Sequence, residues 1–281
     1  MTALINRIID YSEADGPGTR TVLIFQGCNF RCLYCHRPST LGNCNGCGVC
    51  VLHCPAGALT QERPGAQPRW EAEQCTGCGA CVNACRKDSS PRMRRMELQE
   101  TVDLMADRRS RIQGITCSGG ECTLQAAFMT ELFPLMRQQG LSSLIETNGT
   151  LDFEKHQDLL DHCDGVMLDI KAADPALHRE LTGRGNERVF RSAAVLARAG
   201  KLAEVRTVVT ARDFGVRETV EKTAQVLEPY LKNSDICYRF IPFRVFGVRR
   251  EYRSLGSPLR PDLEDLVRLA LDRGFPRALI S

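Results

Sequence analysis

The chain has 281 residues, of which 43% are hydrophobic and 25% are charged, and its formal net charge is +3. This composition is typical of a globular protein with one or two domains, and so small a net charge does not favour nucleic acid or an anionic membrane as a partner. No apolar run approaches the roughly 20 residues of a membrane span, and the first residues lack the order of a signal peptide. We therefore expect a cytoplasmic protein.

Fifteen cysteines are the unusual feature of the composition. Eleven of them fall in C-x2-C or C-x3-C groups before residue 86. Such spacing is typical of metal binding in a reducing compartment rather than of disulfides.

The first structured region contains a Gly-Pro-Gly turn at 16–18 and then an apolar, β-branched run at 21–25, which predicts a buried strand of a parallel sheet. Cys28, Cys32 and Cys35 follow at C-x3-C-x2-C spacing. Three thiolates can hold three irons of a [4Fe–4S] cluster and leave the fourth open to substrate, whereas electron-transfer clusters have four cysteine ligands. Structural zinc or free core cysteines are the alternatives, although zinc usually takes two separated Cys pairs.

Residues 40–90 contain an internal repeat of cysteines. The first set is Cys44, Cys47, Cys50 and Cys54, and the second is Cys75, Cys78, Cys81 and Cys85. Each set matches the bacterial ferredoxin run, in which the fourth cysteine ligates the other cluster. The pattern predicts one cluster on Cys44, Cys47, Cys50 and Cys85, and another on Cys75, Cys78, Cys81 and Cys54. Two four-cysteine zinc sites are the alternative.

The remaining chain alternates between strands and helices. After a basic segment at 91–95, which we expect to be a linker, strands are predicted at 114–117, 141–145, 165–168, 205–209 and 236–241. Helices are predicted at 97–109, 124–139, 153–161, 175–181, 187–199, 217–231 and 262–273. With the strand at 21–25, this indicates an α/β fold, a partial (β/α)6 TIM-like barrel with a lateral opening. Residues 1–39 and 91–281 form the barrel, and 40–90 form a small inserted ferredoxin-like domain.

Polar residues gather where the predicted strands end. Gly119, Gly120 and Glu121 offer a close backbone approach and a carboxylate suited to an ammonium group. Asp169 and Lys171 suit a ribose or a carboxylate. Arg206 lies within an apolar strand and needs an anionic partner, for which a ligand carboxylate is one candidate.

These residues carry a family resemblance. The three-cysteine loop, with Tyr34 before its third cysteine, resembles the signature of the radical S-adenosylmethionine (SAM) superfamily, and Ser118-Gly119-Gly120-Glu121 resembles its amino-group motif. The segments at 15–20, 34–36, 146–149 and 169–171 narrow the resemblance to glycyl-radical-enzyme activating enzymes that have a ferredoxin-like insert. The resemblance covers nearly the whole chain.

The resemblance implies an anaerobic oxidoreductase that reductively cleaves SAM to a 5′-deoxyadenosyl radical, which removes hydrogen from a backbone glycine of a partner enzyme. It implies three [4Fe–4S] clusters, a flavodoxin- or ferredoxin-type reductant, a glycyl radical enzyme as protein substrate, and a monomeric activase. The two clusters of the insert would relay electrons or help to dock the partner.

The resemblance also assigns residues. Cys28, Cys32 and Cys35 would hold the catalytic cluster, with Tyr34 and His36 near the adenine. Gly119, Gly120 and Glu121 would take the methionine amine. Asp169, Ile170 and Lys171 would bind the ribose and carboxylate, helped by Arg206. Glu146, Thr147, Met167 and Asp169 match the positions of a monovalent cation, although Glu146 stands where an Asp is more typical.

Two other functions fit parts of the pattern. A radical SAM enzyme that acts directly on a small molecule or peptide would share every cluster motif. A ferredoxin-type electron carrier would use the insert alone, but it would not need the three-cysteine loop or the polar strand ends.

Overall fold

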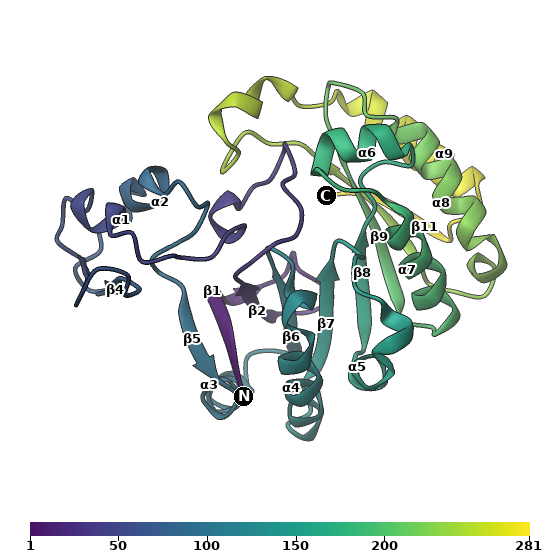
Figure 1. Ribbon diagram of the computed structural model, residues 1–281. Coiled ribbons are helices and arrows are strands. Elements are labelled where there is room, and N and C mark those ends of the chain that lie inside the picture. The colour runs from purple at the N-terminus through teal and green to yellow at the C-terminus, as the bar shows by residue number, and fades with distance from the viewer.

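The computed structural model describes residues 1–281, which form one large twisted sheet with helices along its outer face (Figure 1). The order of its nine strands is β11-β10-β9-β8-β7-β6-β2-β1-β5. Seven consecutive strands are parallel: β2 (Arg20–Phe25), β6 (Gly114–Gly119), β7 (Ser142–Thr147), β8 (Gly165–Asp169), β9 (Leu202–Val209), β10 (Cys237–Pro242) and β11 (Arg277–Ile280). β1 (Thr2–Ser12) and β5 (Arg94–Glu97) complete one edge in antiparallel pairing.

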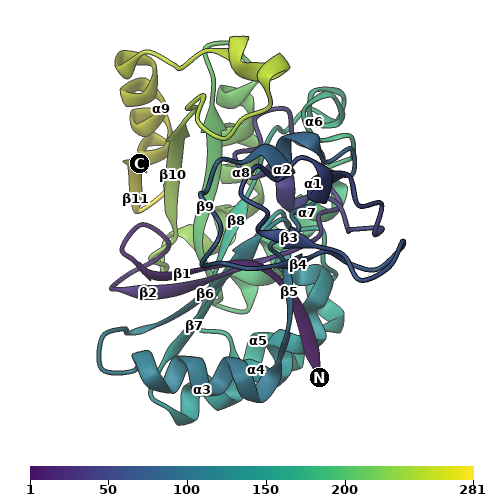
Figure 2. The same cartoon turned by 90° about the vertical axis from the view of Figure 1, so that its left-hand side faces the viewer.

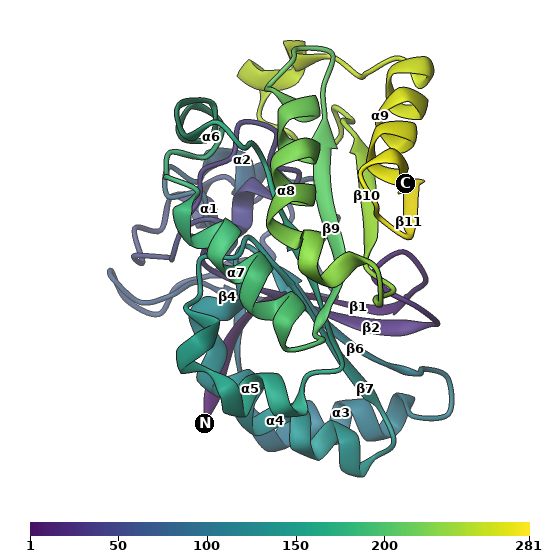
Figure 3. The ribbon, with the colours of Figure 1, turned by 90° about the vertical axis from the view of Figure 1, so that its right-hand side faces the viewer.

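Helices connect the parallel strands and pack against them (Figure 3). They are α3 (Leu98–Arg108), α4 (Ala126–Gln138), α5 (Gln157–His162), α6 (Pro175–Thr182), α7 (Glu187–Arg198), α8 (Val216–Leu231) and α9 (Arg260–Asp272). In α7, Val189, Ala193 and Leu196 are buried at helical spacing and belong to a core of 47 buried residues. No helix is long and apolar enough to cross a membrane.

The predicted α/β class is confirmed, and each of the six predicted strands is present. The sheet also contains three strands that were not predicted, β1, β5 and β11. The linker expected at 91–95 is wrong for Arg94 and Arg95, which begin β5 and pair with Ile5 and Leu4 of β1. Both strands are rich in polar residues because one face of this edge is open, so their pairing depends on tertiary contacts rather than on a local apolar pattern.

Residues 40–90, called the insert below, project from the β1–β5 side of the sheet (Figure 2). They form the short helices α1 (Val49–Leu52) and α2 (Ala80–Ala84) and a two-stranded ribbon of β3 (Leu59–Thr60) and β4 (Arg69–Trp70). Gly48 and Gly79 begin the two helices in the same left-handed conformation, which reflects the repeat in the sequence. The buried apolar cluster of the insert contains only Cys50, Leu59 and Cys81.

Candidate functional site

The polar strand ends meet at one edge because parallel strands align their carboxyl termini. In the sheet register Phe25 lies opposite Gly119, and Asp169 lies opposite Arg206. The cysteine loop after β2 therefore lies beside the Gly-Gly turn after β6, while the other polar groups follow on β7, β8 and β9.

The Gly119–Gly120 turn packs directly on the backbone at the end of β2. Gly119 has φ +132°, and a Cβ there would lie 2.3 Å from the Phe25 nitrogen. A Cβ on Gly120 would lie 2.2 Å from the Gly27 oxygen. The Gly120 N–H donates to the Phe25 carbonyl at 3.1 Å, and the Glu121 N–H to the Gly27 carbonyl at 2.8 Å. Only glycine permits this approach, which ties the turn to the start of the cysteine loop.

The Glu121 carboxylate is buried, and donors of the protein occupy both of its oxygens. It accepts hydrogen bonds from the Thr123 N–H at 3.1 Å, the Thr147 hydroxyl at 2.8 Å and the Asn148 N–H at 2.7 Å. Burial raises the pKa of Glu121, and these hydrogen bonds oppose that rise. The side chain therefore joins the ends of β6 and β7, so in this structure it is a positioning group rather than a free partner for an ammonium.

The cysteine loop is held by neighbours that the sequence pattern did not single out. Asn148 donates to the Asn29 side chain at 2.9 Å, and Asn29 donates to Thr150 at 2.7 Å. On the other side, the N–H groups of Arg31 and Leu33 donate to carbonyls at the end of α6, both at 2.9 Å. The carbonyl contacts have no signature in the sequence, whereas Asn29 could have been found from its place inside the cysteine loop.

The three thiols of the loop are partly buried and lie near one another. Burial raises the pKa of Cys28 to about 12 and that of Cys32 to about 11, although the positive charge of Lys171 opposes the rise at Cys32. The free thiols are therefore protonated at neutral pH and would bind iron with release of protons. Three thiols without a fourth fit a [4Fe–4S] cluster with one iron open.

Tyr34, Lys171 and Asp169 form a compact group beside the thiols. The Lys171 ammonium lies 3.0 Å from the Asp169 carboxylate and 5.8 Å from the centre of the Tyr34 ring. Burial would lower the pKa of Lys171, but Asp169 and Cys32 raise it well above its ordinary value. The Tyr34 hydroxyl is buried without a hydrogen-bond partner. His36 is exposed at the rim, with its ring edge-on to Phe243 at 6.2 Å. A cation, an acceptor and an unpaired hydroxyl here suit a polar ligand such as a nucleoside.

Ile170 is a correction to the predicted site. Its side chain lies in the hydrophobic core on the helix side of the sheet. Its N–H donates to the Arg206 carbonyl at 2.9 Å, and its own carbonyl accepts from the Thr207 hydroxyl at 2.8 Å. Residues alternate between the faces of a strand, so the neighbours Asp169 and Lys171 reach the site while Ile170 does not.

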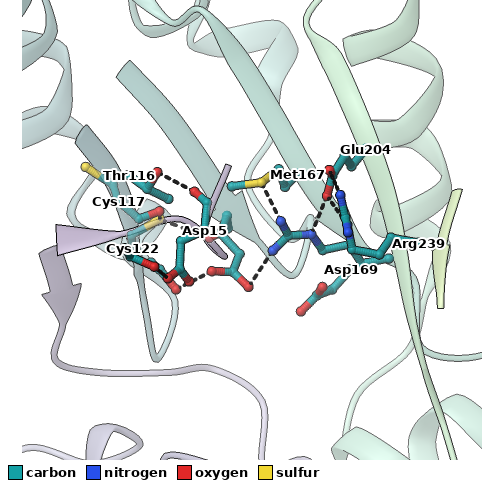
Figure 4. Close-up of polar contacts among 12 residues, drawn as sticks. Asp15, Thr116, Cys117, Cys122, Met167, Asp169, Glu204 and Arg239 are labelled. Carbon is teal, nitrogen blue, oxygen red and sulfur yellow. Dashed lines mark hydrogen bonds and ion pairs between the residues drawn. The ribbon is translucent and has the colours of Figure 1, made fainter. Parts of the chain in front are cut away.

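Arg206 lies inside the barrel in a network of protein charges. Its guanidinium contacts Glu146 at 3.0 Å and Glu204 at 2.8 Å, and Glu204 also pairs with Arg239 at 2.7 Å. Figure 4 shows Met167, Asp169, Glu204 and Arg239 gathered at this point. The anionic partners that a buried arginine requires are thus supplied by the protein itself.

The positions matched to a monovalent cation do not fit one here. Glu146 accepts from Arg206 and, at 2.5 Å, from Ser118, and Met167 sulfur lies against the same guanidinium. Asp169 is paired with Lys171. Arginine and lysine already provide the positive charge that these groups would offer to an ion.

The insert brings its eight cysteines together in two crossed groups. Cys44, Cys47, Cys50 and Cys85 line one pocket, and Cys54, Cys75, Cys78 and Cys81 line the other. Each group contains three cysteines of one run and the fourth of the other run, which is the ferredoxin arrangement. No three Cys, His, Asp or Glu side chains are close enough to share a single ion. The thiols of a cluster bind separate irons and lie farther apart, so this geometry favours clusters over zinc.

The Gly-Pro-Gly turn lies at the opposite end of β2 from the cysteine loop, roughly 16 Å away for a strand of this length. The Thr116 hydroxyl donates to the Asp15 carbonyl at 2.7 Å, as Figure 4 shows, and Arg20 donates to the Pro17 carbonyl at 3.2 Å. The turn is therefore fixed at that end of the barrel, where Pro17 and Gly18 are exposed.

Comparisons with known proteins agree with this site. Residues 22–228 match the family model of the radical SAM superfamily. The pyruvate formate-lyase-activating enzyme of Streptococcus mutans is 28% identical, over 96% of this chain and 90% of that protein. The 4-hydroxyphenylacetate decarboxylase activating enzyme of Clostridioides difficile is 26% identical, over 98% of this chain and 95% of that protein. The crystal structure of Streptococcus suis SuiB bound to S-adenosylmethionine shares the fold, with a TM-score of 0.56, 12% identity, and coverage of 92% of this chain and 51% of that one.

Proposed function

This chain belongs to the radical SAM superfamily, and we propose that it is a glycyl-radical-enzyme activating enzyme, which abstracts hydrogen from a backbone glycine of a partner protein. Its similarity to activating enzymes runs over 96% and 98% of its length in two of them. That similarity carries the proposal, because a radical SAM enzyme for a small molecule would share every cluster motif, so the motifs alone do not distinguish the two functions. When bound, SAM and a reduced [4Fe–4S] cluster would supply the 5′-deoxyadenosyl radical needed to remove the hydrogen.

The residues of the chain divide the work of holding the cofactors. Cys28, Cys32 and Cys35 would bind the catalytic cluster. Lys171 and Asp169 provide a charge pair for the carboxylate and ribose of SAM, beside the buried ring of Tyr34. Glu121 and Arg206 hold the strand ends that carry these groups.

Three clusters are part of the proposal. The two crossed groups of cysteines in the insert support two further [4Fe–4S] clusters besides the catalytic one. Cys47 and Cys78 are exposed at the surface of the insert. A flavodoxin- or ferredoxin-type reductant could deliver electrons there. We also propose a cytoplasmic, monomeric enzyme.

The function is tested under anaerobic conditions. The protein is reconstituted with iron and sulfide, reduced, and mixed with SAM and each of three candidate partners, pyruvate formate-lyase, choline trimethylamine-lyase and 4-hydroxyphenylacetate decarboxylase. We expect 5′-deoxyadenosine together with a glycyl radical, detected by electron paramagnetic resonance, on one of them. SAM cleavage without a radical on any glycyl radical enzyme would instead favour direct action on a small molecule or peptide.

Two cysteine variants separate the catalytic cluster from the insert. Cys32→Ala removes a ligand of the open-iron cluster, so it should abolish SAM cleavage. Cys78→Ala should retain some cleavage when a small artificial reductant replaces the natural one. Equal loss in both variants would make the insert part of the catalytic site.

A further inference from the structure

The largest groove of the molecule runs between the insert and the barrel and has a volume of about 800 Å³. One wall comes from the insert, at 77–92, and the other from the segment after β10, at 247–253. The residues just after the three cysteines, 36–40, lie between these walls. Figure 1 shows the insert and the segment after β10 on either side of that loop.

The floor of the groove is the inner face of the sheet edge. Arg7 lies opposite Ile24, and Ile9 opposite Val22, in the β1–β2 pair. Leu23 and Phe25 point into the helix-packed core, so the alternate side chains of these strands face inward. Arg7, Ile9 and Ile24 line the groove. The groove is therefore the lateral mouth of the barrel, continuous with its interior.

Six arginines line this mouth, namely Arg7, Arg37, Arg92, Arg249, Arg250 and Arg253. None of them has a carboxylate within 4.0 Å, although thirteen other arginines of the chain do. Of the two acidic residues in the groove, Asp88 is already paired with Arg31 at 2.6 Å. The Nε atoms of Arg92 and Arg249 are buried without a hydrogen-bond partner. The positive charge of the groove is thus left for a ligand outside the chain.

An exposed apolar pair lies in the chain just before the second wall. Phe246 is 88% exposed and Val245 is 51% exposed. They come immediately before Gly247, the first residue of that wall. An exposed aromatic side chain beside arginines is the composition of a protein-binding hot spot rather than of a small-molecule pocket.

We propose that this arginine groove is the docking surface for the protein substrate, and that it binds an acidic surface segment next to the partner's reactive glycine. The inference rests on the proposed function and adds the charge of the partner and the role of the insert as one wall of the substrate site. A reductant has its own approach over Cys47, an exposed cysteine of the insert that does not line the groove. The groove instead leads into the barrel. Only the protein substrate has to place a segment there, the one that carries its reactive glycine, whereas a reductant does not.

The test uses the reconstituted enzyme and a fluorescent polyglutamate peptide of about 20 residues as an acidic probe, with polylysine of equal length as the control. We expect polyglutamate to bind, polylysine not to bind, and the affinity to fall as salt rises. Arg250→Glu/Arg253→Glu should weaken binding by about fivefold or more. Arg217→Glu changes an exposed arginine of α8 that has no recorded partner and should leave binding unchanged.

Two further measurements distinguish a protein substrate from a reductant as the occupant of the groove. Flavodoxin reduces the clusters, and the loss of their absorbance measures the rate of that reduction. The rate should be the same in the double variant and the parent enzyme. SAM cleavage with dithionite, in the absence of a partner, should also be unchanged.

Equal polyglutamate affinity in the double variant and the parent would overturn the docking proposal, as would slower reduction by flavodoxin in the double variant. Neither result bears on the activase function, which depends on the glycyl radical assay alone. If that assay fails while polyglutamate still binds as expected, the groove belongs to an acidic protein substrate of another kind.

Discussion

At the scale of single residues, the site depends on buried charges that hold strand ends in place. Glu121 is the clearest example, because four groups that follow or end two different strands donate to its carboxylate. In Glu121→Gln, one carboxylate oxygen becomes an NH2 group that faces donors. We expect a loss of about 1–3 kcal/mol in the free energy of unfolding and weaker SAM binding, measured by denaturant titration and calorimetry. Glu131→Gln, an exposed change on α4, is the control and should alter neither quantity.

Arg206 provides a second test at this scale, since it could hold either protein carboxylates or the ligand. In Arg206→Leu, Glu146 loses its ion pair inside the barrel, and we expect a loss of about 3–5 kcal/mol in the free energy of unfolding. The double variant Arg206→Leu/Glu146→Leu also removes the unpaired Glu146 carboxylate, so it should regain part of the lost free energy of unfolding. Arg273→Leu breaks only an exposed pair with Glu221 and should cost at most about 1 kcal/mol. A variant that kept its stability but lost SAM affinity would show that Arg206 serves the ligand instead.

At the scale of elements, the crossing of cysteines between the two halves of the insert makes a sharp prediction. Cys44 and Cys85 lie in one pocket, whereas Cys54 lies in the other. A reconstituted chain with three clusters holds about 12 irons. Cys44→Ser/Cys85→Ser should therefore lose one cluster and keep about 8 irons, while Cys44→Ser/Cys54→Ser should lose two and keep about 4. Iron and sulfide analysis measures both variants. The reverse result, with about 4 irons in Cys44→Ser/Cys85→Ser and about 8 in Cys44→Ser/Cys54→Ser, would mean that the pairing is not crossed.

The elements also explain which parts of the fold and site could be predicted from the sequence. All six residues of β2 are buried, so its apolar pattern is unambiguous. β1 carries Asn6, Arg7 and Asp10 because one of its faces lines the open mouth of the barrel, so no local pattern indicated a strand. The cysteine spacings were informative because ligand positions along a chain are part of the chemistry. The ion pairs of Arg206 could not be predicted from the sequence, because its partner Glu146 comes from a strand 60 residues earlier in the chain.

At the scale of the whole molecule, the barrel and the insert are stabilised by different means. The core cluster of the barrel contains 47 buried residues, whereas the buried apolar cluster of the insert contains three, and two of these are cysteines predicted to bind iron. A segment with so small a core depends on its metal for folding. Without iron and sulfide we therefore expect the insert to unfold while the barrel stays folded. Exposed Arg69, Arg86 and Lys87 would then become the first sites of tryptic cleavage.

Limited proteolysis followed by mass spectrometry checks this expectation on the cluster-free and the reconstituted protein. Cleavage should concentrate at residues 69–87 in the cluster-free protein and slow markedly after reconstitution, whereas exposed Arg217 on the barrel should be equally resistant in both states. If the cluster-free insert resisted trypsin as well as the barrel does, its few apolar contacts would be sufficient for folding, and its clusters would serve electron transfer alone. Protection by reconstitution would instead mean that the wall of the arginine groove forms only when the clusters are present, so that iron loading would also control access of the protein substrate.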